Sequence, residues 1–167
     1  DIVANPSTTG NTSSSVAKIV KVNVSDLWAG GKIVGVSSLD FSTSATSVLS
    51  MKVYTTEPVG TVIKVKLETP FTSEVDAVTT VSGAWETLKF DFGIPAPTGS
   101  VDLVIMPQPH TQGGGNTFYV DDIMQIEENI ATPRTDLPIT FESGTYTDHF
   151  FSFESATFKN AQQVLAC

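Results

Sequence analysis

Short stretches in which apolar and polar residues alternate run along most of the chain. The clearest is residues 85–92, where Leu88, Phe90 and Phe92 fall on one side of an extended chain and polar residues on the other. Because successive side chains of a strand point to opposite faces, this alternation predicts a strand with one buried and one wet face. Together with runs of β-forming residues, it predicts strands at residues 16–24, 32–36, 48–55, 61–69, 75–81, 85–92, 101–106 and 117–126.

Glycine and proline turns separate the predicted strands. Residues 57–60 form a hairpin-like turn between two of them, and the glycines at 113–115 form a flexible turn before the last. The first 130 residues show no helical periodicity of useful length. We therefore expect an all-β protein, an antiparallel two-sheet β-sandwich of the jelly-roll kind. Trp85, at the start of an alternating strand, is expected to pack inside that sandwich.

Composition narrows the classes of partner. The chain has 167 residues, enough for one domain, and a formal net charge of −9, which disfavours binding to nucleic acid or to an anionic membrane. No apolar stretch is long enough to span a membrane. The low share of charged residues and the abundant Ser, Thr and Val suit an extracellular protein, whether secreted, on a cell surface or on a virion. The single cysteine, Cys167, excludes an internal disulfide framework.

Motifs of common catalytic chemistry are absent from the sequence. It contains no Gly-x-Ser-x-Gly, no His-Glu-x-x-His and no phosphate-binding loop. His110 and His149 are far apart and have no cysteine or carboxylate neighbour at ligand spacing. We therefore predict a non-enzymatic protein with no catalytic residues.

Two adjacent carboxylates, Asp121 and Asp122, follow the β-forming residues Phe118, Tyr119 and Val120. Strand alternation would turn at least one of them toward the interior, where a carboxylate needs a cation, a metal or several hydrogen-bond donors. Ca²⁺ is the natural candidate in a chain so acidic and so poor in His and Cys. The alternative is that both carboxylates end an edge strand in water.

Aromatic side chains exposed on a sheet can stack on sugar rings. Trp28, which lies in a bend beside Gly30 and Gly31, is the best candidate for exposure, and Tyr54 and Tyr119 are the others. Tyr119 has the opposite parity to its neighbours Phe118 and Val120, so it is expected to face outward.

Several of these segments, in this order, form a recognisable set: residues 5–14, then 28–31, 51–54, 85–92 (WETLKFDF) and 118–123 (FYVDDI). The set resembles the jelly-roll carbohydrate-binding modules of bacterial, marine-type polysaccharide-degrading enzymes and surface proteins. The resemblance implies binding to a polysaccharide or surface glycan. It also implies a structural Ca²⁺ held by Glu142 and by Asp121 or Asp122, with backbone carbonyls completing the shell.

The order of one segment departs from these modules. Their early strand with a Phe-Glu pair matches only residues 137–142 here, which follow the Asp-Asp-Ile strand, as in a rotated or out-of-frame repeat. We therefore divide the chain into a β-sandwich module at 1–130, a connector at 131–138 and C-terminal strands at 139–167. Those strands complete either their own sandwich or that of a neighbouring subunit by β-augmentation.

Two functions follow from this reading. The first is a non-catalytic extracellular module for glycan binding or adhesion. The second is a structural repeat of a filament, surface layer or virus appendage, with copies joined head-to-tail by self-association through residues 137–167. Fold alone does not separate them.

Overall fold

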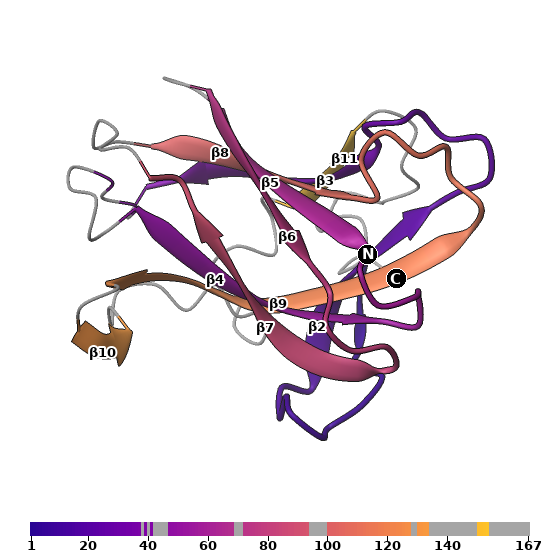
Figure 1. The fold of residues 1–167 in the computed structure, drawn as a ribbon, viewed down its shortest axis with the longest axis horizontal. Helices are drawn as coiled ribbons and strands as arrows, with labels where there is room; N and C mark the ends of the chain where they lie inside the picture. Colours follow the sequence, from indigo (N-terminus) through magenta and orange to yellow (C-terminus); the bar gives the residue numbers. More distant parts are fainter. Residues whose placement is uncertain are drawn as a thin grey trace, which may run out of the picture.

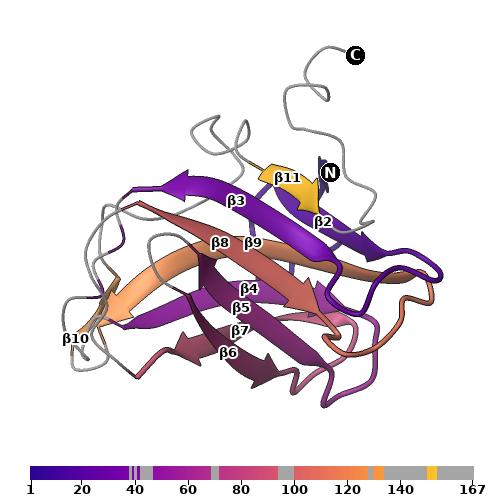
Figure 2. The ribbon, with the colours of Figure 1, turned by 90° about the horizontal axis from the view of Figure 1, so that it is seen from above.

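The computed structural model describes residues 1–37, 39, 41, 47–68, 72–93, 100–127, 130–133 and 150–153. Every regular element within these residues is a strand, and all strand pairs are antiparallel. They form two sheets packed face to face (Figures 1 and 2). The predicted fold, an all-β antiparallel sandwich, is confirmed. The described residues include no helix of the length and apolarity that a membrane span requires.

The first sheet, here sheet A, has the strand order β1-β2-β9-β4-β7, with β10 also paired to β9. The second, sheet B, has the order β11-β3-β8-β5-β6. The strands of sheet A are β1 (Ile2–Ala4), β2 (Ser15–Lys21), β4 (Val48–Thr55), β7 (Ala84–Asp91), β9 (Asn116–Glu127) and β10 (Ile130–Pro133). Those of sheet B are β3 (Gly30–Val36), β5 (Val62–Glu68), β6 (Ser73–Val78), β8 (Val101–Pro107) and β11 (Phe150–Phe153).

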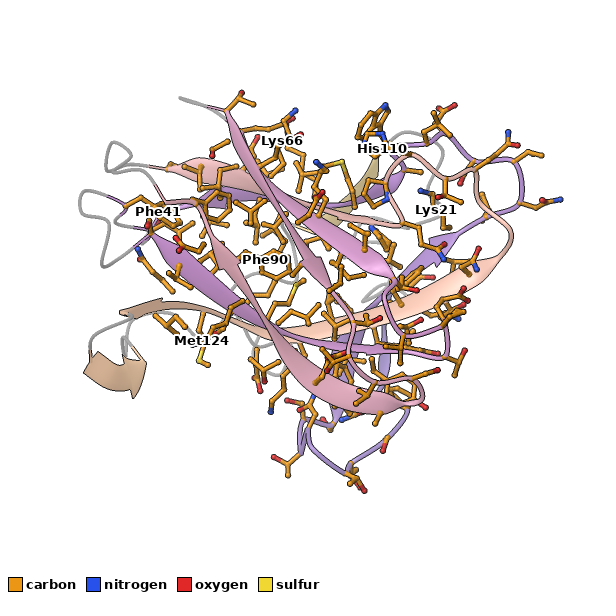
Figure 3. All side chains as sticks on the ribbon, in the orientation of Figure 1. Lys21, Phe41, Lys66, Phe90, His110 and Met124 are labelled. Atoms are coloured by element: carbon orange, nitrogen blue, oxygen red, sulfur yellow. The ribbon has the colours of Figure 1, made fainter. Side chains whose placement is uncertain are left out.

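The alternating residues build the core between the sheets. Leu88 and Phe90 of β7 lie opposite Met51 and Leu49 of β4, and all four side chains are buried. Figure 3 shows Phe90 in the middle of this apolar layer. Ile105 of β8 belongs to the same cluster from the other sheet, so the core joins both layers. Their burial from water is the main stabilising term of such a sandwich.

The turn at residues 57–60 is not a hairpin, and this prediction was wrong. Strand β4 lies in sheet A between β7 and β9, whereas β5 lies in sheet B between β6 and β8. The turn therefore carries the chain from one sheet to the other. The sequence Glu57-Pro58-Val59-Gly60 specifies a reversal of direction, but pairing is decided by which neighbours fill both edges of β4.

The C-terminal part contributes two described strands. Strand β10 pairs with β9, so the first residues of the predicted connector 131–138 are in a strand. Strand β11 pairs with β3 of the same chain, with Phe150 opposite Ile33 (Figures 1 and 2). The division into 1–130, 131–138 and 139–167, and an exchange of residues 137–167 between copies, stay predictions.

Candidate functional site

The outer face of sheet B carries a groove with a volume of about 470 Å³. It crosses several strands, because Lys32 of β3, Val104 of β8 and Lys66 of β5 lie directly opposite one another in register. The complete lining is Trp28, Lys32, Lys66, Glu68, Glu74, Val104 and Met106. An apolar surface framed by polar groups is the usual composition of a small-molecule site.

The apolar floor of the groove comes from one strand. Val104 and Met106 alternate along β8 with Leu103 and Ile105, which face the core. They lie on the outer face and are nevertheless buried, because the long side chains of neighbouring strands flank them. Sequence reasoning missed both residues. The signal was present in the uninterrupted apolar run from Leu103 to Met106, which gives β8 two apolar faces.

Trp28 lines the groove from the loop between β2 and β3. The residue is 37% exposed, which confirms the predicted exposure. The indole meets the ring of His110 edge-on, with centroids 4.1 Å apart and planes at 75°. His110 belongs to the loop between β8 and β9, and its role beside Trp28 was not predicted. Gly30 brings the Trp28 loop back onto β8, where a Cβ would collide with the Ile105 carbonyl.

The charged residues of the groove are joined in ion pairs. Lys32 lies 3.0 Å from Glu68 and 2.9 Å from Asp102, and Lys66 lies 2.8 Å from Glu68. The hydrogen bonds to Asp102 and Glu68 raise the pKa of Lys32, and the hydrogen bond from Lys66 lowers the pKa of Glu68. Glu74 lies 2.9 Å from Lys64. Neither lysine in the groove wall is an unpaired cation.

The other two aromatic candidates lie on the opposite face of the sandwich. Tyr119 of β9 is opposite Tyr54 of β4, and their ring centroids are 5.8 Å apart. Their strand neighbours Val120 and Val53 face the core, so both tyrosines face outward from sheet A, as predicted for Tyr119. Both are half-buried. The structure therefore does not bring Trp28 together with Tyr54 and Tyr119.

Trp85 is buried, but not between the sheets as predicted. It lies opposite Tyr54 on the outer face of sheet A, and its Nε1 donates hydrogen bonds to Asn5 Oδ1 at 3.0 Å and to the Ser7 carbonyl at 2.8 Å. Residues 5–14, which we call the N-terminal segment, cover it. Asn5 also donates to the carbonyls of Asn11 and Ser13, so one side chain holds the segment in shape. The segment has no apolar periodicity, and the sequence alone gave no sign of this cover.

Asp121 is also buried beneath the N-terminal segment, on the outer face of sheet A. It lies opposite Lys52, is fully buried, and accepts a hydrogen bond from Asn11 Nδ2 at 2.8 Å. Its Oδ1 is buried without a hydrogen-bond partner in the described part of the chain. Desolvation raises the pKa of this carboxyl, and hydrogen bonds from the Asn11 and Ser13 side chains and from the Asp122 backbone partly offset that rise. A buried carboxylate oxygen without a donor is the kind of ligand that a hard cation such as Ca²⁺ takes.

Asp122 has a different environment. A β-bulge at this point of β9 places it at a φ of 44°, and its carboxylate lies 2.8 Å from the Lys52 ammonium. Glu142, the third predicted ligand, lies outside the described residues. Among the residues described, no three His, Cys, Asp or Glu side chains cluster as a metal site would require. Of the two described ligands, Asp121 offers an unpartnered buried oxygen, whereas Asp122 is paired with Lys52. The Ca²⁺ site stays a prediction.

The sequence matches no protein family model and no curated protein. Among solved structures, the apo form of PbXyn10C CBM, a xylanase carbohydrate-binding module, is similar, with a TM-score of 0.50 and 15% sequence identity. The match covers 93% of this chain and 89% of that chain. A likeness at this identity establishes the fold alone, a β-sandwich similar to that of this carbohydrate-binding module. It does not identify the marine-type family to which the sequence motifs are similar.

Proposed function

We propose that this chain is a non-catalytic glycan-binding module and that the groove on sheet B is its binding site. The observation that carries the proposal is the exposed Trp28 standing over a floor formed by Val104 and Met106. A sugar ring has an apolar face of C–H groups and a rim of hydroxyls. The indole and the floor suit the first, and the ion-paired Lys66 and Glu68 offer donors and acceptors to the second.

The groove favours a neutral glycan over an acidic one. Lys32 is neutralised by Glu68 and Asp102, and Lys66 shares Glu68, so an incoming carboxylate or sulfate finds no unpaired ammonium among the lining residues. The net charge of −9 adds a further repulsion at long range. We therefore expect neutral polysaccharides to bind and uronic-acid or sulfated polysaccharides not to bind.

The carboxylates of the groove are poorly suited to glycoside hydrolysis. That reaction needs a general acid whose pKa is raised, facing a second carboxylate across the substrate. In the groove, the hydrogen bond from Lys66 instead lowers the pKa of Glu68, and Glu74 is paired with Lys64. These pairings support a binding role without catalysis. An extracellular location, on a secreted, cell-surface or virion-surface protein, fits such a partner and is part of the proposal.

Affinity electrophoresis of the full chain against neutral xylan, β-glucan and mannan, beside polygalacturonate, tests this function. Because Trp28 and Tyr119 lie on opposite faces, Trp28→Ala and Tyr119→Ala report separately on the two faces. We expect Trp28→Ala to weaken binding at least about tenfold, as for an interface hot spot. Val59→Ala, at an exposed apolar residue of the turn between the sheets, is the matched control. Loss of binding with Tyr119→Ala alone would move the site to sheet A, and no binding to any neutral polysaccharide would refute the proposal.

We also propose a structural Ca²⁺ at Asp121. The support is the buried, unpartnered Oδ1 of Asp121 and the implied role of this residue in similar modules. The ion would supply the positive charge that the carboxylate lacks beneath the N-terminal segment. It would act on stability, since Asp121 and Trp28 belong to opposite faces of the sandwich.

A further inference from the structure

Lys21 is an unusual residue in the interior of this sandwich. It ends β2 on the same face as Ala17 and Ile19, which belong to the apolar core, and it is 1% exposed. A buried ammonium normally needs a carboxylate partner. Among the described residues Lys21 has none, and burial lowers the pKa of its ammonium to about 8.

Three backbone carbonyls surround the ammonium instead. Lys21 Nζ donates to the Leu27 carbonyl at 2.9 Å, to the Pro107 carbonyl at 3.1 Å and to the Gln108 carbonyl. An ammonium has three N–H donors, so its donor capacity is filled. Leu27 belongs to the β2–β3 loop, Pro107 is the last residue of β8, and Gln108 begins the β8–β9 loop. The ammonium therefore joins the β2–β3 loop to the start of the β8–β9 loop.

The two loops are those that carry the ring pair of the groove. Leu27 immediately precedes Trp28, and Gln108 is two residues before His110. Figure 3 shows Lys21 and His110 at the same end of the sandwich. The edge-on contact between Trp28 and His110, at 4.1 Å, therefore depends on the relative position of the two loops that Lys21 joins.

Two residues of the β8–β9 loop have backbone conformations that require stabilising contacts. Gln108 and His110 have φ values of 47° and 67°, in the left-handed region that side chains with a Cβ rarely adopt. Such conformations persist only where surrounding contacts fix them. The hydrogen bonds from Lys21 to the carbonyls of Pro107 and Gln108 are contacts of this kind.

We infer that Lys21 is a positioning residue for glycan binding: its ammonium fixes the two loops so that Trp28 stands against His110 over the groove. Lys21 is not among the residues that line the groove, so it would act through Trp28 and not through direct contact with a glycan. This inference rests on the proposed function for its effect on affinity. Its effect on the Trp28 indole is independent of any glycan.

Lys21→Met is the first test, because it keeps the length and apolar stem of the side chain and removes the three donors. Lys89→Met, at an exposed residue of β7, is the matched control. The readout is the pair of indole N–H cross-peaks in a ¹⁵N-tryptophan NMR spectrum. The chain has two tryptophans, so Trp85 serves as an internal reference, and Trp28→Phe assigns the peaks.

We expect Lys21→Met to shift or broaden the Trp28 cross-peak, to leave that of Trp85 in place and to weaken binding to the neutral polysaccharide at least tenfold. A folded Lys21→Met chain with both cross-peaks and the affinity of the wild type overturns the inference. Equal changes in both cross-peaks also overturn it, because they indicate a general loss of structure.

Lys21→Gln is the second variant, for use if the methionine variant does not fold. Its amide has two donors and a shorter reach, so it cannot satisfy all three carbonyls. The same shift or broadening of the Trp28 cross-peak is expected. A wild-type Trp28 cross-peak in the folded glutamine variant refutes the positioning role of Lys21. If Trp28→Ala binds glycan normally, the proposed function fails, whereas the cross-peaks still test Lys21 without a ligand.

Discussion

Trp85 and Asn5 are 80 residues apart in the chain, and the Trp85 indole Nε1 donates a 3.0 Å hydrogen bond to the Asn5 side-chain oxygen. The same oxygen accepts from the Ser7 backbone N–H, while the Asn5 amide nitrogen donates to the carbonyls of Asn11 and Ser13. One side chain therefore fixes the N-terminal segment and attaches it to sheet A. Beneath this segment lie both Trp85 and the buried carboxylate of Asp121.

Asn5→Ala is expected to destabilise the fold by about 2–3 kcal/mol, because it removes four hydrogen bonds and leaves buried groups without partners. Urea denaturation followed by circular dichroism measures the change. Ser7→Ala is the matched control, since the Ser7 carbonyl that accepts from Trp85 is retained. It should alter the free energy of unfolding by less than about 0.5 kcal/mol. Equal effects of the two substitutions would contradict the role assigned to Asn5.

Addition of Ca²⁺ is expected to raise the melting temperature. An ion bound only to the folded state adds about 2.7 kcal/mol at a concentration 100-fold above its dissociation constant, or about 5 °C or more for a chain of this size. Differential scanning calorimetry with CaCl₂ and with EDTA measures the shift. Asp121→Asn should abolish it, whereas Asp122→Asn should retain most of it, because Asp122 is paired with Lys52. An unchanged shift in the Asp121 variant would argue against the site.

Without Ca²⁺, Asp121 is expected to make stability depend on pH. Desolvation raises the pKa of its carboxyl above 3.8 in the folded state, so the folded chain holds this proton more tightly than the unfolded chain. The Asp121 contribution is therefore fully present below pH 3.8 and is lost as the pH rises through the folded pKa. In EDTA at pH 7, Asp121→Asn should be more stable than the wild type. The difference in free energy of unfolding between the two proteins should shrink as the pH is lowered. If urea titrations give the same difference in free energy of unfolding at every pH from 7 down to 3.8, the raised pKa assigned to Asp121 is contradicted.

Glu68→Gln is expected to change the class of glycan that the groove accepts. Lys66 loses its carboxylate partner and Lys32 loses one of two, so the groove gains positive charge. We expect polygalacturonate, which the wild type should not bind, to bind the variant at low salt and to be released at high salt. Glu86→Gln, on β7 of sheet A and outside the groove lining, is the control. Affinity electrophoresis measures both, and binding of polygalacturonate by the wild type would refute the charge argument.

The sandwich was predictable because alternation along a strand records which face is buried. Strand β4 has the bounds predicted for it, Val48–Thr55, since both its faces carry a clear pattern. The crossing of the chain from sheet A to sheet B after Gly60 was not predictable, because a turn sequence does not determine whether the two strands that it joins pair with each other. Strand β1 and the path of the N-terminal segment were not predicted. A polar segment without apolar periodicity does not indicate which surface of the protein it packs against.

The candidate site was predictable only in part. Trp28 was singled out because a tryptophan beside two glycines in a bend is hard to bury, and its exposure is confirmed. The burial of Trp85 was also expected, but it lies on the outer face of sheet A and not between the sheets. Alternation predicted that at least one of Asp121 and Asp122 is buried without saying which, and it could not show that the N-terminal segment covers Asp121. His110 gave no signal, because its contact with Trp28 depends on two loops that are 82 residues apart and meet at Lys21.

The close approach of Gly30 to β8 limits how this protein can be redesigned. No side chain fits at position 30 without displacing the Ile105 backbone, so the loop that presents Trp28 returns to the sheet at a fixed point. Met106 and Val104 lie on the adjacent stretch of β8 and are equally constrained by their burial. Glu74 lies on the exposed edge strand β6 and can be exchanged more freely. A redesign of the groove for a new ligand would therefore keep the Trp28 loop, Val104 and Met106 and would vary Glu74.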